Sequence, residues 1–374
     1  MNSVQRIAEL GQRIWYDSIS RELLSSGALK NLVAQGIRGV TTNPTIFEKA
    51  VRDGAQYDDD LRRASEKETD PAAWVRALMV ADVRQAADIL RPVYDRSLGD
   101  DGYVSIEVDP HKANDTDATI AEAALLWREV GRPNIMIKIP GTAAGLEAIR
   151  QTLRAGINVN ATLLFSPARY DEVAAAYLAA LDDRLQDGQA IDRVASVASV
   201  FVSRVDTEVD ALLRARIKTA PTAEAKRLQA LLGRAGTANA QRIYQRYKDT
   251  FRSKGFARLR ARGARPQWPL WASTSAKDRA YGPVWYIDRL IAPDTINTVP
   301  PATFEAILAH TRPHALLEAE LPQVRGILDG LRREGIDLGA ILDELAVRGV
   351  EAFAASHESL KQVLVSRQAA LVRA

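Results

Sequence analysis

The sequence contains no cysteine and only four histidines, and these two scarcities exclude much chemistry. Without thiols the chain cannot form disulfides, use a thiolate nucleophile or build a cysteine-ligated zinc or iron–sulfur site. His310 and His314 have the spacing of a helical metal pair, but Pro313 interrupts the helix that such a pair needs. His111 and His357 have no partners nearby in the sequence. We therefore expect no metal and no cofactor, and we interpret His310 and His314 as structural.

Long apolar runs and blocks of like charge are also absent. No stretch approaches the length of a membrane-spanning helix, and the N-terminal residues lack the apolar segment of a signal peptide. The 50 basic and 47 acidic residues are interspersed, with a net charge of +3, which argues against a nucleic-acid stripe. We expect a cytoplasmic protein that binds neither nucleic acid nor membrane, and both a monomer and a homodimer remain open.

Strand-like and helix-like segments alternate along the 374 residues, whose 47% apolar content allows a core of normal size. Helical stretches are predicted at Asp115–Val130, Gly145–Ala155, Pro167–Leu185 and Ala223–Thr250. The predicted strands are Gln12–Asp17, Gly39–Asn43, Tyr103–Asp109, Ile135–Pro140, Ile157–Phe165, Ser196–Arg204, Trp268–Thr274 and Thr295–Pro300.

Eight strands followed by helices predict a (β/α)8 TIM barrel. We expect one domain over residues 1–374, with residues 315–374 as a helical C-terminal extension. A doubly wound sheet is the competing α/β architecture, but it usually has a glycine-rich phosphate turn after its first strand. Residues 15–20 read WYDSIS and contain no glycine, which favours the barrel.

One predicted strand carries a lysine among apolar residues. Because side chains alternate along a strand, Met136 and Lys138 share one face and Ile137 lies on the other. A lysine on the inner face of a barrel is unfavourable without compensation. An amine kept away from water is favoured in its neutral form, which can attack a carbonyl carbon. Lys138 is therefore a candidate nucleophile; the alternative is a structural lysine held by an ion pair.

Further polar side chains fall near the C-terminal ends of the predicted strands, where TIM barrels carry their chemistry. A lysine surrounded by carboxylates, amides and hydroxyls is the set that Schiff-base catalysis needs: a nucleophile, acid–base groups and binders of substrate hydroxyls. The neighbours of Lys138 on this reasoning are Asp17, Asn43, Glu107, Asp109, Asn160 and Thr162.

Three segments resemble motifs of the transaldolases. Residues 39–47 read GVTTNPTIF, residues 137–146 read IKIPGTAAGL, and residues 156–166 read GINVNATLLFS. They occur in the family's order, and the resemblance covers roughly residues 13–300. It implies a metal-free enzyme in which a lysine forms an imine with a sugar.

The resemblance implies a catalytic role for four residues. Lys138 is expected to form the imine at C2 of a donor ketose. Asp17 is expected to take the proton of the C4 hydroxyl while the C3–C4 bond breaks. Glu107 and Thr162 are expected to hold a water molecule that relays protons. From the residues alone, Asp17 could instead cap a helix, and Glu107 and Asp109 could form a structural polar layer.

The resemblance also implies substrate-binding residues. Asn43 and Asn160 are expected to bind substrate hydroxyls, although Asn43 could serve only the turn before Pro44. Ser199 and Arg204 are expected to bind the substrate and its phosphate, unless Arg204 pairs with Asp206 or Glu208 on the surface. Many relatives have a phosphate-binding arginine after the seventh strand, and this chain does not. The candidates to replace it are Ser273, Ser275 and Lys277.

The expected function is transaldolase activity in the pentose phosphate pathway. A dihydroxyacetone unit would pass from sedoheptulose 7-phosphate or fructose 6-phosphate to glyceraldehyde 3-phosphate or erythrose 4-phosphate. Three alternatives remain. One is an aldolase like fructose-6-phosphate aldolase, which releases the unit without an acceptor. Another is a non-catalytic sugar-phosphate binder, which the intact catalytic set disfavours. The third is a metal-dependent aldolase, which the lack of a histidine cluster disfavours.

Overall fold

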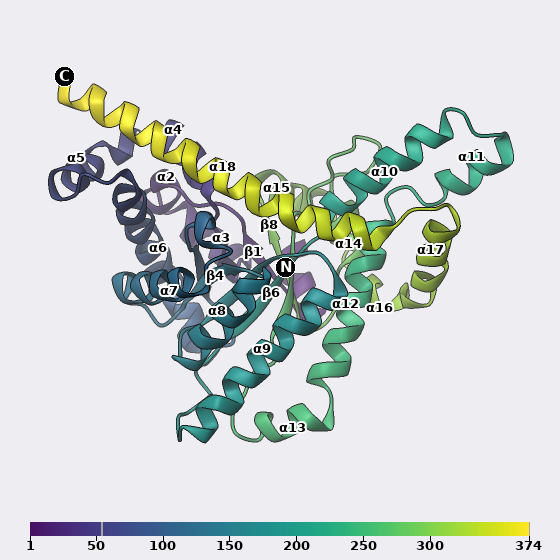
Figure 1. The fold of residues 1–374 in the computed structure, drawn as a ribbon, viewed down its shortest axis with the longest axis horizontal. Helices are drawn as coiled ribbons and strands as arrows, with labels where there is room; N and C mark the ends of the chain where they lie inside the picture. Colours follow the sequence, from purple (N-terminus) through teal and green to yellow (C-terminus); the bar gives the residue numbers. More distant parts are fainter. Residues whose placement is uncertain (54, 374) are drawn as a thin grey trace.

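The computed structural model describes residues 1–53 and 55–373, and the barrel is its central feature (Figure 1). Eight parallel strands form a closed barrel in sequence order, which confirms the predicted (β/α)8 fold. The strands are β1 (Gln12–Tyr16), β2 (Gly39–Val40), β3 (Tyr103–Glu107), β4 (Ile135–Pro140), β5 (Val159–Leu164), β6 (Ser196–Phe201), β7 (Trp268–Ala272) and β8 (Thr295–Val299).

Helices surround the barrel and follow its strands. Those up to β5 are α1 (Ser3–Glu9), α2 (Arg21–Ser25), α3 (Ala28–Gln35), α4 (Pro44–Asp53), η1 (Ala55–Tyr57), α5 (Asp58–Lys67), α6 (Pro71–Arg96), η2 (Pro110–Lys112), α7 (Thr116–Val130) and α8 (Ala143–Arg154). The remainder are α9 (Pro167–Gln186), α10 (Ser203–Ile217), α11 (Thr222–Gln229), α12 (Ala235–Phe251), α13 (Lys254–Arg260), α14 (Trp285–Arg289), α15 (Pro301–His310), α16 (Leu316–Ala319), α17 (Leu321–Arg333) and α18 (Leu338–Arg373). Among the described residues, no helix has the length and apolar character of a membrane span.

Most strands end earlier than the sequence pattern predicted. Asp17, Asn43 and Asp109 lie in the loops just beyond β1, β2 and β3. Pro44 begins α4 and Pro110 begins η2, and a proline cannot donate the hydrogen bond that would extend a strand. These polar residues therefore lie on the loops at the C-terminal rim of the barrel, where side chains are available for binding and catalysis.

The strand β5 departs from regular geometry next to one of the candidate catalytic residues. The register between β5 and β6 shifts between Ala161 and Leu164, and Leu163 has a φ of 58°. A branched apolar residue in this conformation is strained, and such strain is commonly held at functional sites. The irregularity begins immediately after Thr162.

The predicted helix Ala223–Thr250 is wrong as a single element, because the chain forms α11 and α12 with a turn between them. Gly233 lies in this turn with a φ of 67°, which favours glycine. Its N–H donates to a carboxylate oxygen of Asp210 at 2.9 Å, and the N–H of Gly236 donates to Asp206 at 2.8 Å. These two hydrogen bonds to α10 determine where α12 begins, which helix propensity alone does not predict.

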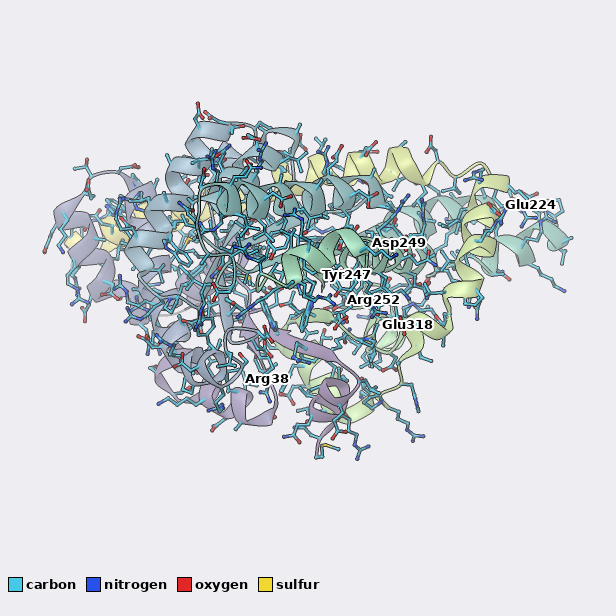
Figure 2. The ribbon with its side chains drawn as sticks, turned by 90° about the horizontal axis from the view of Figure 1, so that it is seen from below. Arg38, Glu224, Tyr247, Asp249, Arg252 and Glu318 are labelled. Atoms are coloured by element: carbon cyan, nitrogen blue, oxygen red, sulfur yellow. The ribbon has the colours of Figure 1, made fainter. Side chains whose placement is uncertain are left out.

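The predicted C-terminal helices are α16, α17 and α18. Glu318 of α16 accepts hydrogen bonds from Tyr244 at 3.3 Å and Lys248 at 2.9 Å, both on α12. Figure 2 shows Glu318 on the same side of the molecule as Tyr247 and Arg252 of α12. The 36-residue helix α18 then runs back across the molecule and packs against α4, α5, α6 and α10 (Figure 1). We propose that these helices and the barrel form one domain.

Candidate active site

A buried ion pair lies at the centre of the site. Glu107 and Lys138 occupy paired positions on β3 and β4, and Lys138 Nζ lies 3.0 Å from Glu107 Oε2. The ammonium also donates to the carbonyl oxygen of Thr42 at 3.2 Å. Lys138 is only 5% exposed and Glu107 only 3%, so both groups are held away from bulk water. Lys138 therefore has the inward orientation that the strand pattern predicted.

The carboxyl group of Glu107 is placed to exchange protons. Burial raises its pKa, and the adjacent Lys138 opposes that rise. Its Oε1 atom and the Oγ1 atom of Thr162 are both buried, and neither has a hydrogen-bond partner among the described residues. Buried polar atoms are normally paired, so each of these two atoms is available to a polar molecule.

Asp17 faces the same site through a short chain of hydroxyl groups. Thr41 Oγ1 donates to Asp17 Oδ1 at 2.6 Å and lies 2.5 Å from Thr298 Oγ1. Burial raises the pKa of Asp17, while the Thr41 hydroxyl, Lys138 and Lys277 lower it. The helix-cap alternative for Asp17 is wrong, because α2 begins at Arg21 and its cap is Ser20. Asp17 is thus a half-buried carboxyl group that does not cap the adjacent helix.

A cavity of about 280 Å³ opens above Lys138. It brings together nine of the eleven residues to which the resemblance gives a role, from six strand ends and their loops. The other two, Glu107 and Asn160, are absent from its lining. Its lining residues are Asp17, Thr41, Asn43, Thr45, Ile46, Lys138, Thr162, Ser199, Phe201, Arg204, Ala272, Ser273, Ser275, Lys277, Thr298, Pro300 and Phe353.

The two predicted asparagines occupy different places. Asn43 lines the cavity, and its Oδ1 accepts a hydrogen bond from the N–H of Ile46 at 3.0 Å, so it also stabilises the first turn of α4. Asn160 is fully buried; its Nδ2 donates to Ser105 at 3.0 Å and its Oδ1 accepts from Ser199 at 2.6 Å. Asn160 holds Ser199 in place, and its direct binding of a substrate hydroxyl stays a prediction.

Arg204 contributes a positive charge to the cavity. The alternative surface pairing is not found, because Glu208 pairs with Arg348 at 3.1 Å and Asp206 accepts from Tyr286 at 2.9 Å. Arg204 forms no ion pair with any residue that the structure describes, and its guanidinium carbon lies 5.1 Å from the centre of the Phe201 ring. Burial lowers the pKa of Arg204. An anion bound in the cavity could therefore form an ion pair with Arg204.

The loop after β7 brings the three candidates for the missing arginine to the cavity wall. Ser273 has a φ of 54°, and its hydroxyl lies 2.9 Å from that of Ser203 at the start of α10. Ser275 lies 2.8 Å from the hydroxyl of Thr303. Lys277 is exposed and has no ion pair within residues 1–53 and 55–373. Of the three, Lys277 alone supplies a second positive charge.

Sequence reasoning missed a residue from the C-terminal helix. Phe353 of α18 lines the cavity, and its ring centre lies 5.3 Å from Lys138 Nζ. Its ring also packs edge-on against Phe201, at 6.4 Å between centres. Phe353 helps to shield the amine from water. No local pattern in the sequence links a residue of α18 to the mouth of the barrel.

Asp109 is not a neighbour of Lys138, which corrects the expectation from the sequence. The strand ends at Glu107, and Asp109 caps η2 by accepting a hydrogen bond from the N–H of His111 at 3.0 Å. Its carboxylate lies beside His111 and His357 and outside the cavity above Lys138.

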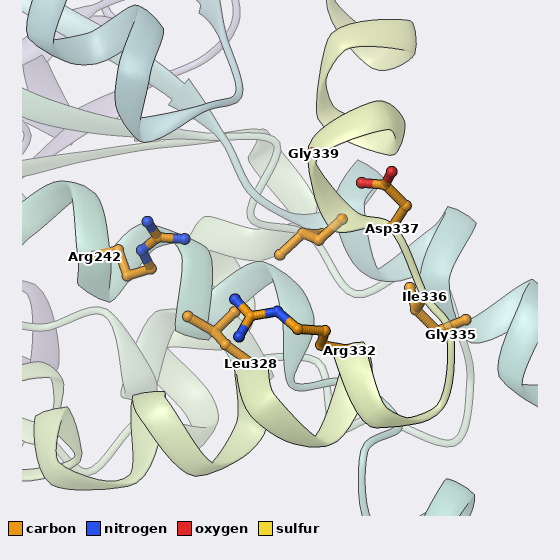
Figure 3. Close-up of a pocket in the computed structure, with 8 residues that line it drawn as sticks. Arg242, Leu328, Arg332, Gly335, Ile336, Asp337 and Gly339 are labelled. Atoms are coloured by element: carbon orange, nitrogen blue, oxygen red, sulfur yellow. The ribbon is translucent and has the colours of Figure 1, made fainter.

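A separate cavity of about 460 Å³ lies between α12, α17 and the start of α18 (Figure 3). Two exposed arginines, Arg242 and Arg332, extend along its wall, together with Leu328 and Asp337. It contains no lysine, so it offers no amine for imine formation. The chemistry that the sequence predicts is therefore possible in the cavity above Lys138 and not in this one.

Comparison with known proteins shows the family to which the chain belongs. The family model described as transaldolase/fructose-6-phosphate aldolase matches residues 14–364. The chain belongs to this family, which confirms the resemblance to the transaldolases that the three motifs indicated.

Curated relatives match almost the whole chain. A protein named transaldolase 2 from Nostoc sp. is 44% identical over 370 residues, covering 97% of both chains. Transaldolase 2 of Nostoc punctiforme is 45% identical over 369 residues, again covering 97% of both. The transaldolase of Thermobifida fusca is 43% identical over 369 residues and covers 98% of both.

Proposed function

We propose that this protein is a transaldolase that transfers a dihydroxyacetone unit between sugar phosphates through an imine on Lys138. The observation that carries the proposal is the buried pair of Lys138 Nζ and Glu107 Oε2 at 3.0 Å beneath a polar cavity. The near full-length relatives named transaldolase support the transfer reaction. The reaction belongs to the pentose phosphate pathway, and we infer a cytoplasmic location, which suits a chain without cysteine.

The first step requires a neutral amine at Lys138. Glu107 is within hydrogen-bonding distance, and its raised pKa makes its carboxylate a stronger base than an exposed glutamate. The amine then attacks C2 of the donor ketose, and the carbinolamine loses water to form the imine. Glu107 Oε1 and Thr162 Oγ1 are the atoms that we assign to the water that carries protons in this step.

Asp17 acts in the second step. Its carboxylate removes the proton of the C4 hydroxyl, the C3–C4 bond breaks, and the electron pair of that bond moves into the protonated imine. An aldose phosphate leaves, and a three-carbon enamine stays on Lys138. Attack of this enamine on an acceptor aldehyde reverses the sequence, and hydrolysis of the new imine releases the product ketose.

Arg204 and Lys277 bind the phosphate in this proposal. Both line the cavity, and neither has an ion pair among the residues described. An arginine presents a planar group that can bind two phosphate oxygens at once, while a lysine acts as a point charge. Lys277 therefore supplies charge but not the geometry of the arginine found in many relatives. Asn43 and Ser199 remain the candidates to bind substrate hydroxyls, with Ser273 and Ser275 beside the phosphate.

The acceptor decides between transfer and simple cleavage. With fructose 6-phosphate alone, we expect about one equivalent of glyceraldehyde 3-phosphate per active site, because the enamine stays on Lys138. Addition of erythrose 4-phosphate should then give sustained turnover to sedoheptulose 7-phosphate. Quenched-flow product analysis measures both phases. Sustained release of free dihydroxyacetone without acceptor would assign the protein to the aldolases, and no product in either case would assign it to the non-catalytic binders.

Replacement of Asp17 separates imine formation from cleavage. Asp17→Ala should lower turnover by about 10²- to 10⁴-fold, the usual contribution of a general acid–base group. Lys138 is intact in this variant, so borohydride should trap an adduct that carries all six carbons of fructose 6-phosphate. The wild-type protein, treated in parallel, should accumulate the three-carbon adduct. Intact-protein mass spectrometry distinguishes the two, and rapid formation of the three-carbon adduct by Asp17→Ala would remove Asp17 from the cleavage step.

The hydroxyl of Thr41 tunes the acid limb of the pH profile. It donates to Asp17 and lowers the pKa of that carboxyl group, so Thr41→Val should raise the pKa. Asp17 is active as the carboxylate. The acid limb of kcat/KM should therefore move to higher pH in the variant. Thr45→Val is the matched control, because Thr45 lines the same cavity but bonds to Ser356 at 2.8 Å. An unchanged acid limb in Thr41→Val would mean that another group controls it.

A further inference from the structure

Two segments far apart in the sequence, one with Asp109 and His111 and one with His357, meet outside the cavity above Lys138. Asp109 Oδ1 lies 2.8 Å from His111 Nδ1, on η2, and 3.3 Å from His357 Nδ1, on α18. A ring nitrogen of each histidine and a carboxylate oxygen of Asp109 all lie within 4.8 Å of one another. The two imidazole rings stand edge to face, with their centres 5.7 Å apart. The fold thus brings three potential ligand atoms together.

The geometry is close to that of a metal site. Zinc bonds of about 2.0–2.2 Å to nitrogen and oxygen, in a tetrahedron, place the ligand atoms about 3.3 Å apart. The side chain of His111 is 44% exposed, so its ring can rotate toward that spacing without movement of the backbone. His357 is 7% exposed, and the packing of α18 fixes its position.

We propose that Asp109, His111 and His357 bind a divalent transition-metal ion of the zinc type. Two imidazoles and a carboxylate are a donor set that Zn²⁺ and its neighbours favour, and three protein ligands leave a position for water. The ion lies outside the catalytic cavity and takes no part in imine chemistry. It joins η2 to α18. The expectation of no metal rested on sequence spacing, which does not show this cluster.

The surroundings of the three residues are compatible with a cation. The Nε2 atom of His357 is buried and has no hydrogen-bond partner among the described residues. Two lysines lie close in the sequence, and each is paired: Lys112 with Glu122 at 2.8 Å and Lys361 with Glu358 at 2.5 Å. A cavity of about 280 Å³ is lined by Asp109 and His357 and also by Glu107 and Arg76, and Arg76 is paired with Glu129 at 3.3 Å.

Metal titration of the intact chain tests the proposal. Tag-free protein, freed of metal on a chelating resin, is titrated with Zn²⁺ in a calorimeter and with Co²⁺ in a visible spectrometer. We expect one ion per chain, a Co²⁺ spectrum of low-symmetry nitrogen and oxygen coordination, and a higher Tm with Zn²⁺. The metal-free protein should keep its transaldolase turnover, so failure of this proposal is distinguishable from failure of the proposed function.

Two variants and one control identify the ligands. His111→Ala and His357→Gln should each weaken Zn²⁺ binding by at least about tenfold and abolish the rise in Tm. His111 is exposed, so its variant tests the site even if His357→Gln does not fold. The double variant His310→Ala, His314→Ala removes the other two histidines and should bind like the wild type. No binding by the wild type, or equal binding by His111→Ala, would leave the cluster as a hydrogen-bonded link and overturn the proposal.

Discussion

The ion pair of Glu107 and Lys138 is the interaction on which the site depends. Parallel pairing of β3 and β4 sets the two residues side by side, and the closed barrel keeps water from them. A buried pair contributes little to stability over an apolar replacement, but loss of one partner costs about 3–5 kcal/mol. We propose that its value here is chemical, because the Glu107 carboxylate lies within hydrogen-bonding distance of the Lys138 amine and can take its proton when a ketose arrives. The hydroxyl of Thr41 donates to Asp17 and opposes the rise that burial causes in the pKa of that carboxyl group.

The C-terminal helices complete the site that the barrel begins. Helix α18 runs across the molecule and brings Phe353 to within 5.3 Å of Lys138 Nζ. The same helix carries His357, one turn further on, to Asp109 at the end of β3. The proposed metal site and the cover of the active site therefore share one helix. Helix α16 precedes α18 in the chain, and it is held on α12 by the bond between Glu318 and Lys248.

Much of this arrangement could be predicted from the sequence, because local patterns encode it. The pattern of apolar and polar residues predicted the eight strands and the inward orientation of Lys138. Three sequence motifs identified the family. The predicted C-terminal ends of the strands were less accurate, because the strands end where hydrogen bonding between neighbouring strands stops, as it does before Pro44 and Pro110. The break at Gly233 depends on a carboxylate of α10. Phe353 and the meeting of His111 with His357 depend on the path of α18, which tertiary packing sets and no local pattern encodes.

We propose that Lys138 forms the covalent intermediate. Peptide mapping by mass spectrometry after treatment with fructose 6-phosphate and borohydride, which reduces an imine to a stable amine, locates the labelled residue. We expect the added mass on Lys138, its loss together with activity in Lys138→Met, and its retention in Lys277→Met, which removes the other lysine of the cavity. A label on Lys277 or on any other lysine, or a label that persists in Lys138→Met, would mean that Lys138 is not the nucleophile.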